Sequence, residues 1–275
     1  MPNLAELRDQ LLTQLRSLGS CAVAFSAGVD STVVAKAAQL ALSDNAVAVT
    51  GSSFSMAAGE LDQARELAEL IGIRHVVIAT DEFSSPDYLR NAPDRCYHCK
   101  TELYTQLEKR LDELGVAWIV NGANVDDLGD YRPGMRAAGE HRVVSPLADC
   151  GFTKDDVRTL AKAWDLPVWD KPATPCLSSR VAYGEEVTPE RLRMIDQGEQ
   201  FLRQANLPTV RVRYHRGDLA RLEVPLAALP KMIDESFRRE LLTHFRSLGF
   251  KFITLDLEGF RSGSMNQLVE LKLGK

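Results

Sequence analysis

A loop of small and polar residues, 26–31 (SAGVDS), separates a short apolar run from an Ala-rich stretch. Small residues allow backbone N–H groups to approach a phosphate, and a following helix N-terminus adds positive potential. Serine hydroxyls can donate hydrogen bonds there, and Asp30 can hold the divalent ion that accompanies phosphates. A plain turn with a capping Asp or Ser is the simpler alternative, and neither GxxxxGK[ST] nor GxGxxG fits. The position after a buried strand favours a nucleotide site formed by Ser26, Gly28, Val29, Asp30 and Ser31.

A second polar segment, residues 122–127 (GANVDD), follows another short apolar run. Asn and Asp at the carboxyl end of a strand can contact ribose, phosphate or Mg²⁺. Alone, the segment is typical of an Asp-rich turn. Together with SAGVDS it predicts that Gly122, Asn124 and Asp126 contribute to the same nucleotide site.

Three cysteines lie in segments that could do chemistry. Cys96 and Cys99 form a CxxC pair in RCYHCK, and Cys176 lies in TPCLSSR. Two thiolates at this spacing can bind one metal ion or one edge of an iron–sulfur cluster, and a redox pair or half of a zinc site with His98 are alternatives. Arg180 near Cys176 favours a lowered thiol pKa and a nucleophilic role.

Two arginines share one face of an expected strand. Arg211 and Arg213 alternate with Val210 and Val212, so their side chains point the same way. Paired guanidinium groups suit a phosphate. A solvated strand face is the equally simple interpretation.

These residues need a scaffold that brings strand ends together, and the hydrophobic pattern predicts one. Apolar stripes indicate helices and short apolar runs indicate strands, and the two alternate along the first part of the chain. The expected helices are 4–18, 32–42, 61–71 and 103–114, and the expected strands are 21–25, 46–50, 75–79 and 118–121. The fold class is therefore α/β, a doubly wound parallel sheet.

The rest of the chain has a different pattern. A helix with a capping Thr and an initial Pro is expected over 188–204, followed by a hairpin over 210–224, a helix over 231–248 and a strand over 250–255. We therefore expect a nucleotide-binding domain over 1–170, a linker with Cys176 over 171–187, and a smaller α+β domain over 188–275.

Composition limits the function classes. The chain has 275 residues, 45% hydrophobic and 26% charged, with 33 Lys and Arg against 38 Asp and Glu and a net charge of −5. This argues against a nucleic-acid-binding protein with an overall basic surface, and no apolar stretch is long enough for a membrane span. Five cysteines, an odd count, and no evident secretory signal predict a cytoplasmic protein without a disulfide framework, in which Cys21 and Cys150 are buried apolar residues.

The motifs together carry a family resemblance. SAGVDS resembles the PP-loop of the adenine-nucleotide alpha-hydrolase superfamily, whose members cleave ATP between the alpha and beta phosphates and adenylate a substrate oxygen; the superfamily usually has Gly where this chain has Ala27. SAGVDS, RCYHCK, NGANVDDLGDYRPGMRAA, PCLSSR and LDLEGFRSGSMN, in this order, resemble the LarE family over nearly the whole chain. Its members are ATP-dependent pyridinium-3,5-biscarboxylic acid mononucleotide sulfurtransferases, which help to assemble the nickel-pincer nucleotide cofactor of lactate racemase and related enzymes.

The resemblance implies a two-step reaction. The PP-loop holds ATP and Mg²⁺, a substrate carboxylate attacks the alpha phosphate, and a sulfur nucleophile then displaces AMP. In members without the CxxC pair, the cysteine that matches Cys176 gives up its sulfur and becomes dehydroalanine. In members with the pair, Cys96, Cys99 and Cys176 would hold a 4Fe–4S cluster whose open iron can carry a sulfide. This chain has all three cysteines, which favours the cluster, with single-use transfer as the alternative.

The resemblance also implies the substrate site and the partners. Arg180, Arg211 and Arg213 would bind the substrate, with its phosphate near Cys176, and Glu199 and Glu223 are further candidates for metal or substrate contact. The expected partner is a small nucleotide substrate, with no nucleic acid and no membrane, and the chain is expected to form a homo-oligomer. A PP-loop tRNA thiolase and a non-catalytic nucleotide sensor with a structural zinc are the competing hypotheses.

Overall fold

The computed structural model describes residues 3–128, 133–207 and 209–261, which form two compact units. Unit 1 comprises Met1–Ser53, Gly59–Ser84 and Cys96–Thr174, and unit 2 comprises Phe54–Ala58, Ser85–Arg95 and Pro175–Lys275. Two short stretches from the first half of the sequence therefore belong to the same unit as the C-terminal part. Residues 129–132 and 262–266, which complete two of the family motifs, lie outside the described residues.

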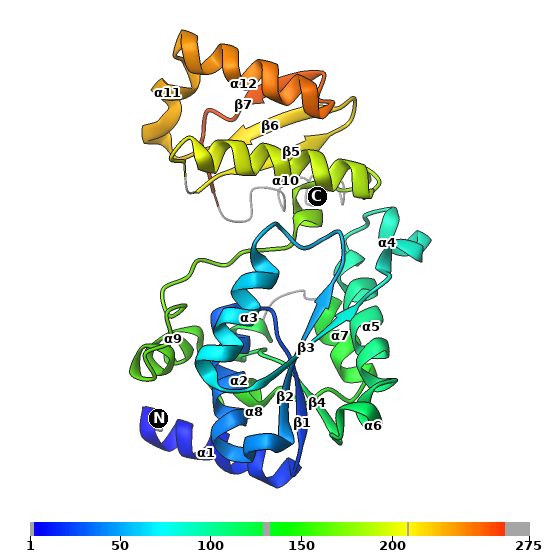
Figure 1. Ribbon diagram of the computed structural model, residues 1–275, viewed down its shortest axis with the longest axis vertical. Coiled ribbons are helices and arrows are strands. Elements are labelled where there is room, and N and C mark those ends of the chain that lie inside the picture. The colour runs from blue at the N-terminus through cyan, green and yellow to red at the C-terminus, as the bar shows by residue number, and fades with distance from the viewer. Residues whose placement is uncertain (1–2, 129–132, 208, 262–275) are drawn as a thin grey trace, which may run out of the picture. The chain divides into compact units, whose positions relative to one another are not determined.

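The centre of unit 1 is a four-stranded parallel sheet (Figure 1). The strands are β1 (Cys21–Ala24), β2 (Ala46–Ser52), β3 (Arg74–Ala79) and β4 (Trp118–Val120), in the order β3-β2-β1-β4. β1 is buried along its whole length because it lies between β2 and β4 with helices on both faces. The predicted doubly wound α/β fold is confirmed.

Helices cover both faces of this sheet (Figure 1). The helices on one face are α1 (Leu4–Leu18), α2 (Val29–Leu42), α3 (Glu60–Ile71), α8 (Pro146–Asp149) and α9 (Lys154–Ala163). Val23, Val33 and Leu160 are among the residues buried in this layer of the core. The helices on the other face pack Tyr104 and Leu107 against Val47 and Val49: α5 (Arg95–Glu108), α6 (Leu111–Leu114) and α7 (Pro133–Glu140). The alternation of inward residues along the strands divides the core into these two layers.

Two helix boundaries differ from the sequence expectation in ways that matter for function. α2 begins at Val29 and not at Thr32, so the second half of the polar loop forms the first turn of a helix. The helix expected over 103–114 is two helices, and α5 begins as early as Arg95, so the CxxC pair is helical. Apolar periodicity missed both starts because these first turns carry polar residues.

Unit 2 contains a three-stranded sheet with helices (Figure 1). Its strands are β5 (Arg211–His215), β6 (Leu219–Glu223) and β7 (Phe252–Leu255), where β5 pairs antiparallel and β7 parallel to β6. Its helices are α4 (Pro86–Leu89), α10 (Pro189–Gln204), α11 (Leu229–Ile233) and α12 (Glu235–Leu248). A Cβ at Gly198 in α10 would lie 3.0 Å from the Phe245 ring and 3.4 Å from Val212, so this glycine allows α10, α12 and β5 to pack closely.

The expected helix over 231–248 is therefore interrupted, and α12 starts anew at an Asp234 cap that accepts from Phe237 N. None of the helices within the described ranges is both long and apolar enough to cross a membrane.

Candidate functional site

The loop after β1 is built as a backbone cradle. β1 ends at Ala24, and Ala27 adopts a left-handed conformation with φ 55° before Gly28 caps α2. The Ser31 hydroxyl donates to Gly28 O at 3.1 Å and accepts from Ser26 N at 3.2 Å, so the two serines hold the loop closed on itself. The N–H groups of a first helical turn have no partner inside the helix, and here they belong to Val29 and its neighbours. This arrangement suits a phosphate.

The loop after β4 packs directly against the start of α2. A Cβ at Gly122 would lie 2.7 Å from Ser31 N, so only glycine allows this close approach. Asn124 then donates from Nδ2 to Asp30 Oδ1 at 3.0 Å. The structure therefore brings together the two polar segments, because the carboxyl ends of the adjacent strands β1 and β4 share one edge of the sheet.

A lysine that the sequence analysis missed completes this cluster. Lys154, the first residue of α9, places Nζ 2.5 Å from Asp30 Oδ2, and its backbone N–H donates to Asp126 Oδ2 at 2.8 Å. Asp30 is 24% exposed and Lys154 35% exposed, so solvent reaches the ion pair. A partly exposed carboxylate among amide and hydroxyl groups has the oxygen chemistry that Mg²⁺ prefers, and Asp30 therefore fits the ion that accompanies ATP. The capping sequence around Thr153 could have revealed a helix start there, but not its contact with Asp30.

The CxxC pair lies on one face of a helix in unit 1. Cys96 is exposed and Cys99 is half-buried, three residues apart in α5, a spacing that puts both thiols on the same side. Tyr97 anchors this turn to α7, because Arg136 lies 3.8 Å from the centre of its ring and its hydroxyl donates to Glu140 at 2.6 Å. The pair is therefore presented at the surface of a fixed helix.

The third cysteine belongs to unit 2, where many contacts hold its turn. Cys176 is half-buried and precedes a 3₁₀ turn, Leu177–Arg180. Leu177 N donates to Ser55 O at 2.9 Å, the Tyr88 and Ser178 hydroxyls lie 2.6 Å apart, and Arg95 donates to Ser178 O at 2.8 Å. The segments Phe54–Ala58 and Ser85–Arg95, which contain Ser55, Tyr88 and Arg95, thus fix the backbone beside Cys176. Arg95, directly before Cys96 in the chain, is a positioning residue that sequence reasoning missed.

The three cysteines fit an iron–sulfur cluster by their chemistry. None of them is in a disulfide, and soft thiolates are the usual ligands of such clusters. Across the residues that the structure describes, no group of three or more His, Cys, Asp and Glu side chains gathers to hold a metal ion. Cys21 is buried in β1, and burial raises its thiol pKa to about 12, as expected of an inert cysteine. Cys150 is only half-buried and donates to Gln14 at 3.1 Å, so the expectation of a buried apolar residue is wrong there.

Arg180 and Glu199 form a buried ion pair. Arg180 is 1% exposed and Glu199 0%, with Nε 3.0 Å from Oε1. Arg180 also donates to the carbonyl oxygens of Pro175 and Cys176, and Glu199 accepts from Arg203 at 2.6 Å. Arg180 therefore supports the Cys176 turn directly, and Glu199 supports it by holding Arg180.

The two arginines of β5 differ in their partners. Arg213 Nη2 donates to the buried Glu223 at 2.8 Å, and Glu223 also pairs with Arg221 at 3.2 Å. Within the described residues, the Arg211 guanidinium meets the Val210 carbonyl at 2.8 Å and the Phe260 ring at 5.2 Å, not a carboxylate. Burial, and next the charge of Arg180, lower the Arg211 pKa to about 10. Arg211 is thus the cation of this strand with charge left to offer an anion.

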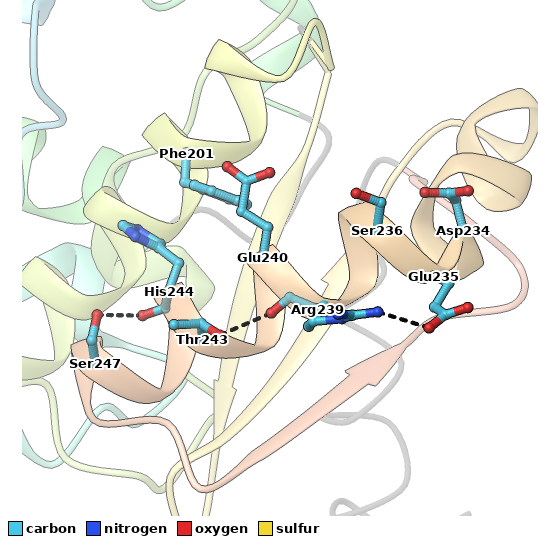
Figure 2. Close-up of a pocket in the computed structure, with 9 residues that line it drawn as sticks. All are labelled: Phe201, Asp234, Glu235, Ser236, Arg239, Glu240, Thr243, His244 and Ser247. Carbon is cyan, nitrogen blue, oxygen red and sulfur yellow. Dashed lines mark hydrogen bonds and ion pairs between the residues drawn. The ribbon is translucent and has the colours of Figure 1, made fainter.

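A separate shallow groove of about 850 Å³ runs along α12 (Figure 2). Several of its side chains bond to one another or to the backbone of their own helix. Arg239 pairs with Glu235 at 2.7 Å, and Thr243 and Ser247 donate to carbonyl oxygens one turn back. His244 stacks on Phe201 with ring centres 4.4 Å apart. The residues predicted for chemistry do not line it.

Comparison with known proteins identifies the family of this chain. Residues 4–107 match the family described as asparagine synthase. The chain is 44% identical over 247 residues to the uncharacterized protein slr1717 of Synechocystis sp., over 90% of this chain and 92% of that one. It is 38% identical over 268 residues to the pyridinium-3,5-bisthiocarboxylic acid mononucleotide synthase of Lactiplantibacillus plantarum, over 97% of this chain and 96% of that enzyme. The chain belongs to the LarE family.

Membership of the LarE family makes the chain an ATP-dependent sulfurtransferase with a PP-loop. A tRNA-specific 2-thiouridylase MnmA of Azorhizobium caulinodans is also similar, at 31% identity, but over only 62% of this chain and 53% of that enzyme. The LarE relative is covered over 96% of its length, whereas the thiouridylase is matched over only 53%. The PP-loop, with Ala27 in place of the usual Gly, therefore belongs to a LarE-type enzyme.

Proposed function

We propose that this enzyme transfers sulfur to an adenylated carboxylate of pyridinium-3,5-biscarboxylic acid mononucleotide during biosynthesis of the nickel-pincer nucleotide cofactor. The observation that carries the proposal is the end-to-end similarity to the Lactiplantibacillus plantarum synthase. The hydrogen bond between Asn124 and Asp30 at the PP-loop, and three cysteines that form no disulfide, support it. We further propose that it acts on this small nucleotide in the cytoplasm as a homo-oligomer, the state that the family resemblance implies.

The first step joins the substrate to AMP. The N–H groups at the start of α2 bind the phosphates, and Asp30 holds the Mg²⁺ that balances their charge. A carboxylate oxygen of the substrate attacks the alpha phosphorus, the bond to the beta-phosphate oxygen breaks, and pyrophosphate leaves. Asn124 orients Asp30 through its 3.0 Å hydrogen bond. This step is required because oxide is too poor a leaving group for direct attack on a carboxylate.

The second step forms the carbon–sulfur bond. A sulfur nucleophile attacks the carbonyl carbon of the acyl adenylate, and AMP leaves with the bonding electrons. Arg211 binds the substrate phosphate, because its charge is the one on β5 without a carboxylate partner among the described residues, and Arg213 lies on the same face. The Arg180–Glu199 pair holds the Cys176 turn in place.

The sulfur source is the finer part of the proposal. Cys96, Cys99 and Cys176 would hold a 4Fe–4S cluster, which when bound supplies the sulfide to be transferred. The presence of all three cysteines in this chain, none of them in a disulfide, supports this ligand set. The alternative is that Cys176 gives up its own sulfur once and becomes dehydroalanine.

The test compares single cysteine variants of anaerobically purified protein. Iron–sulfur absorbance and bound iron should be lost in Cys96→Ala, Cys99→Ala and Cys176→Ala alike, and retained in Cys150→Ala, a half-buried cysteine outside the set. With sulfide supplied, the unmodified enzyme should make several products per chain.

Intact-protein mass spectrometry after reaction provides the contrary outcome. A chain lighter by one hydrogen sulfide at Cys176, one product per chain and full activity of Cys96→Ala would exclude the cluster and support single-use transfer. Sulfur incorporation into tRNA instead of the mononucleotide would replace the proposed substrate by that of a thiouridylase.

A further inference from the structure

A second lysine contacts the PP-loop, and neither the motifs nor the proposed mechanism assign it a role. Lys171 Nζ donates to Ala27 O at 3.2 Å and to Gln63 Oε1, on α3, at 2.6 Å. Its backbone is held to α9, because Arg158 donates to Trp169 O at 3.0 Å and to Lys171 O at 3.2 Å. The side chain therefore reaches the PP-loop from an anchored backbone, and all these residues belong to unit 1.

The carbonyl that Lys171 holds controls the loop conformation. Ala27 has φ 55° and is 1% exposed, and the left-handed region is disfavoured for a residue with a Cβ unless its surroundings hold it there. The peptide bond between Ala27 and Gly28 is trans, so its C=O and N–H point in opposite directions. Fixing the Ala27 oxygen therefore also fixes the direction of the Gly28 N–H at the start of α2.

The charge of Lys171 differs from that of the other lysine at the site. Lys154 is paired with the Asp30 carboxylate at 2.5 Å. The two hydrogen-bond partners of Lys171, in the ranges that the structure covers, are neutral oxygens. Burial lowers the Lys171 pKa, and the negative charge of Glu60 opposes that shift. The ammonium has three N–H groups, so its two bonds leave one donor.

We propose that Lys171 is a positioning residue of the nucleotide site: it fixes the Ala27–Gly28 peptide so that the PP-loop backbone is ready to receive the triphosphate of ATP. The chain then needs no glycine at position 27, because the ammonium stabilises the conformation that glycine would adopt freely. Lys171 should therefore affect the binding of ligands with a phosphate chain, such as ATP and pyrophosphate, and not the binding of the nucleoside alone. It rests on the use of ATP by the family and is independent of the sulfur source.

Equilibrium binding to the full-length protein tests this role by calorimetry, with ATP–Mg²⁺, pyrophosphate–Mg²⁺ and adenosine as separate ligands. Lys171→Met keeps the length of the side chain and removes its charge and donors. The dissociation constants for ATP–Mg²⁺ and pyrophosphate–Mg²⁺ should rise about tenfold or more, the usual scale for a lost charged hydrogen bond. The constant for adenosine should stay within about twofold, and Lys171→Arg should recover part of the phosphate affinity.

Two further variants separate positioning from general stability. Gln63→Glu offers the ammonium a carboxylate while Lys171 remains, and a smaller loss of ATP–Mg²⁺ affinity is expected as the ammonium moves away from Ala27. Lys162→Met is the control, because its ammonium lies over the Trp169 ring at 4.6 Å, and phosphate binding should be unchanged. Unchanged ATP–Mg²⁺ affinity in Lys171→Met, or an equal loss of adenosine affinity, would overturn the proposal. Either result would leave the sulfurtransferase assignment intact.

Discussion

Unit 1 has an ion pair at the PP-loop, Asp30 with Lys154, and unit 2 has an ion pair near Cys176, Arg180 with Glu199. The two pairs differ in burial. Asp30 and Lys154 are 24% and 35% exposed, and Asp30 has an amide as its other partner. Glu199 and Arg180 are 0% and 1% exposed, and a second arginine, Arg203, donates to the same carboxylate. Water screens the first pair, whereas the second lies in the interior.

The comparison shows which charges are available for chemistry. An ion pair that solvent reaches contributes little to stability, so Mg²⁺ and ATP can replace Lys154 beside Asp30 at small cost. A buried pair is strongly destabilised when one partner is removed, because the other charge stays in the interior. We therefore infer that Asp30 can exchange its ion-pair partner. Arg180 and Glu199 instead act as a fixed support for Cys176.

The largest effect is expected for catalysis at the exposed pair. Asp30→Ala removes the proposed Mg²⁺ ligand, so pyrophosphate release from ATP should fall by roughly 1000-fold, the rate equivalent of the several kcal/mol that a bound metal contributes. The melting temperature should hardly change, because the lost ion pair is screened. A pyrophosphate-release assay together with thermal unfolding measures both. Normal adenylation by Asp30→Ala would mean that ATP binds elsewhere.

The next effect is expected for stability at the buried pair. Glu199→Gln preserves the shape of the side chain but leaves the Arg180 charge uncompensated, so the free energy of unfolding should fall by about 3–5 kcal/mol. Denaturant unfolding measures this difference. The matched control is Glu235→Gln, which breaks an ion pair to Arg239 whose side chains are 77% and 75% exposed, and it should cost less than about 1 kcal/mol. Equal effects of the two substitutions would contradict the difference between a buried and an exposed ion pair.

The smallest effect is expected at β5, where Arg213 is paired with a buried glutamate and Arg211 is the candidate for binding the substrate phosphate. Arg211→Ala should raise the KM for the mononucleotide about 10- to 100-fold, the equivalent of about 1.5–3 kcal/mol for a charge-assisted phosphate bond, and leave stability nearly unchanged. Arg213→Ala should instead lower stability, because Glu223 is 0% exposed and loses one of its two arginines. Steady-state kinetics and unfolding on both variants make the comparison. If neither substitution changes KM, the β5 arginines do not bind the substrate.

Local sequence signals predicted most of the scaffold of unit 1. The apolar runs of β1 and β4 and the loops after them were recognisable because buried parallel strands are short and uniformly apolar. Adjacent strand ends share a sheet edge, and so Asp30 and Asn124 were expected to meet. Helix starts rich in polar residues were missed, at Val29 and at Arg95, because the helices were assigned from apolar periodicity and these first turns lack it.

The residues that hold the site were out of reach of sequence patterns. Lys154 meets Asp30 from 124 positions along the chain, and Lys171 meets Ala27 from 144 positions away. Arg95 and Ser178 are 83 residues apart. A lysine or arginine in a polar segment looks like a solvated surface residue until the fold supplies its partner. The assignment of segments 54–58 and 85–95 to unit 2 likewise follows from their contacts in the fold and not from their composition.

The sequence by itself determined which chemical groups this protein has for its reaction: a PP-loop with a carboxylate, three cysteine thiols and paired arginines, together with the α/β class. Only the tertiary structure decided which of those charges remain available. Arg211 retains its charge for an anion, while Arg213 and Arg180 are neutralised by buried glutamates. The physical reason is that residue type sets the charge, whereas burial and partners, which arise from contacts between distant segments, decide whether that charge stabilises the fold or binds a ligand.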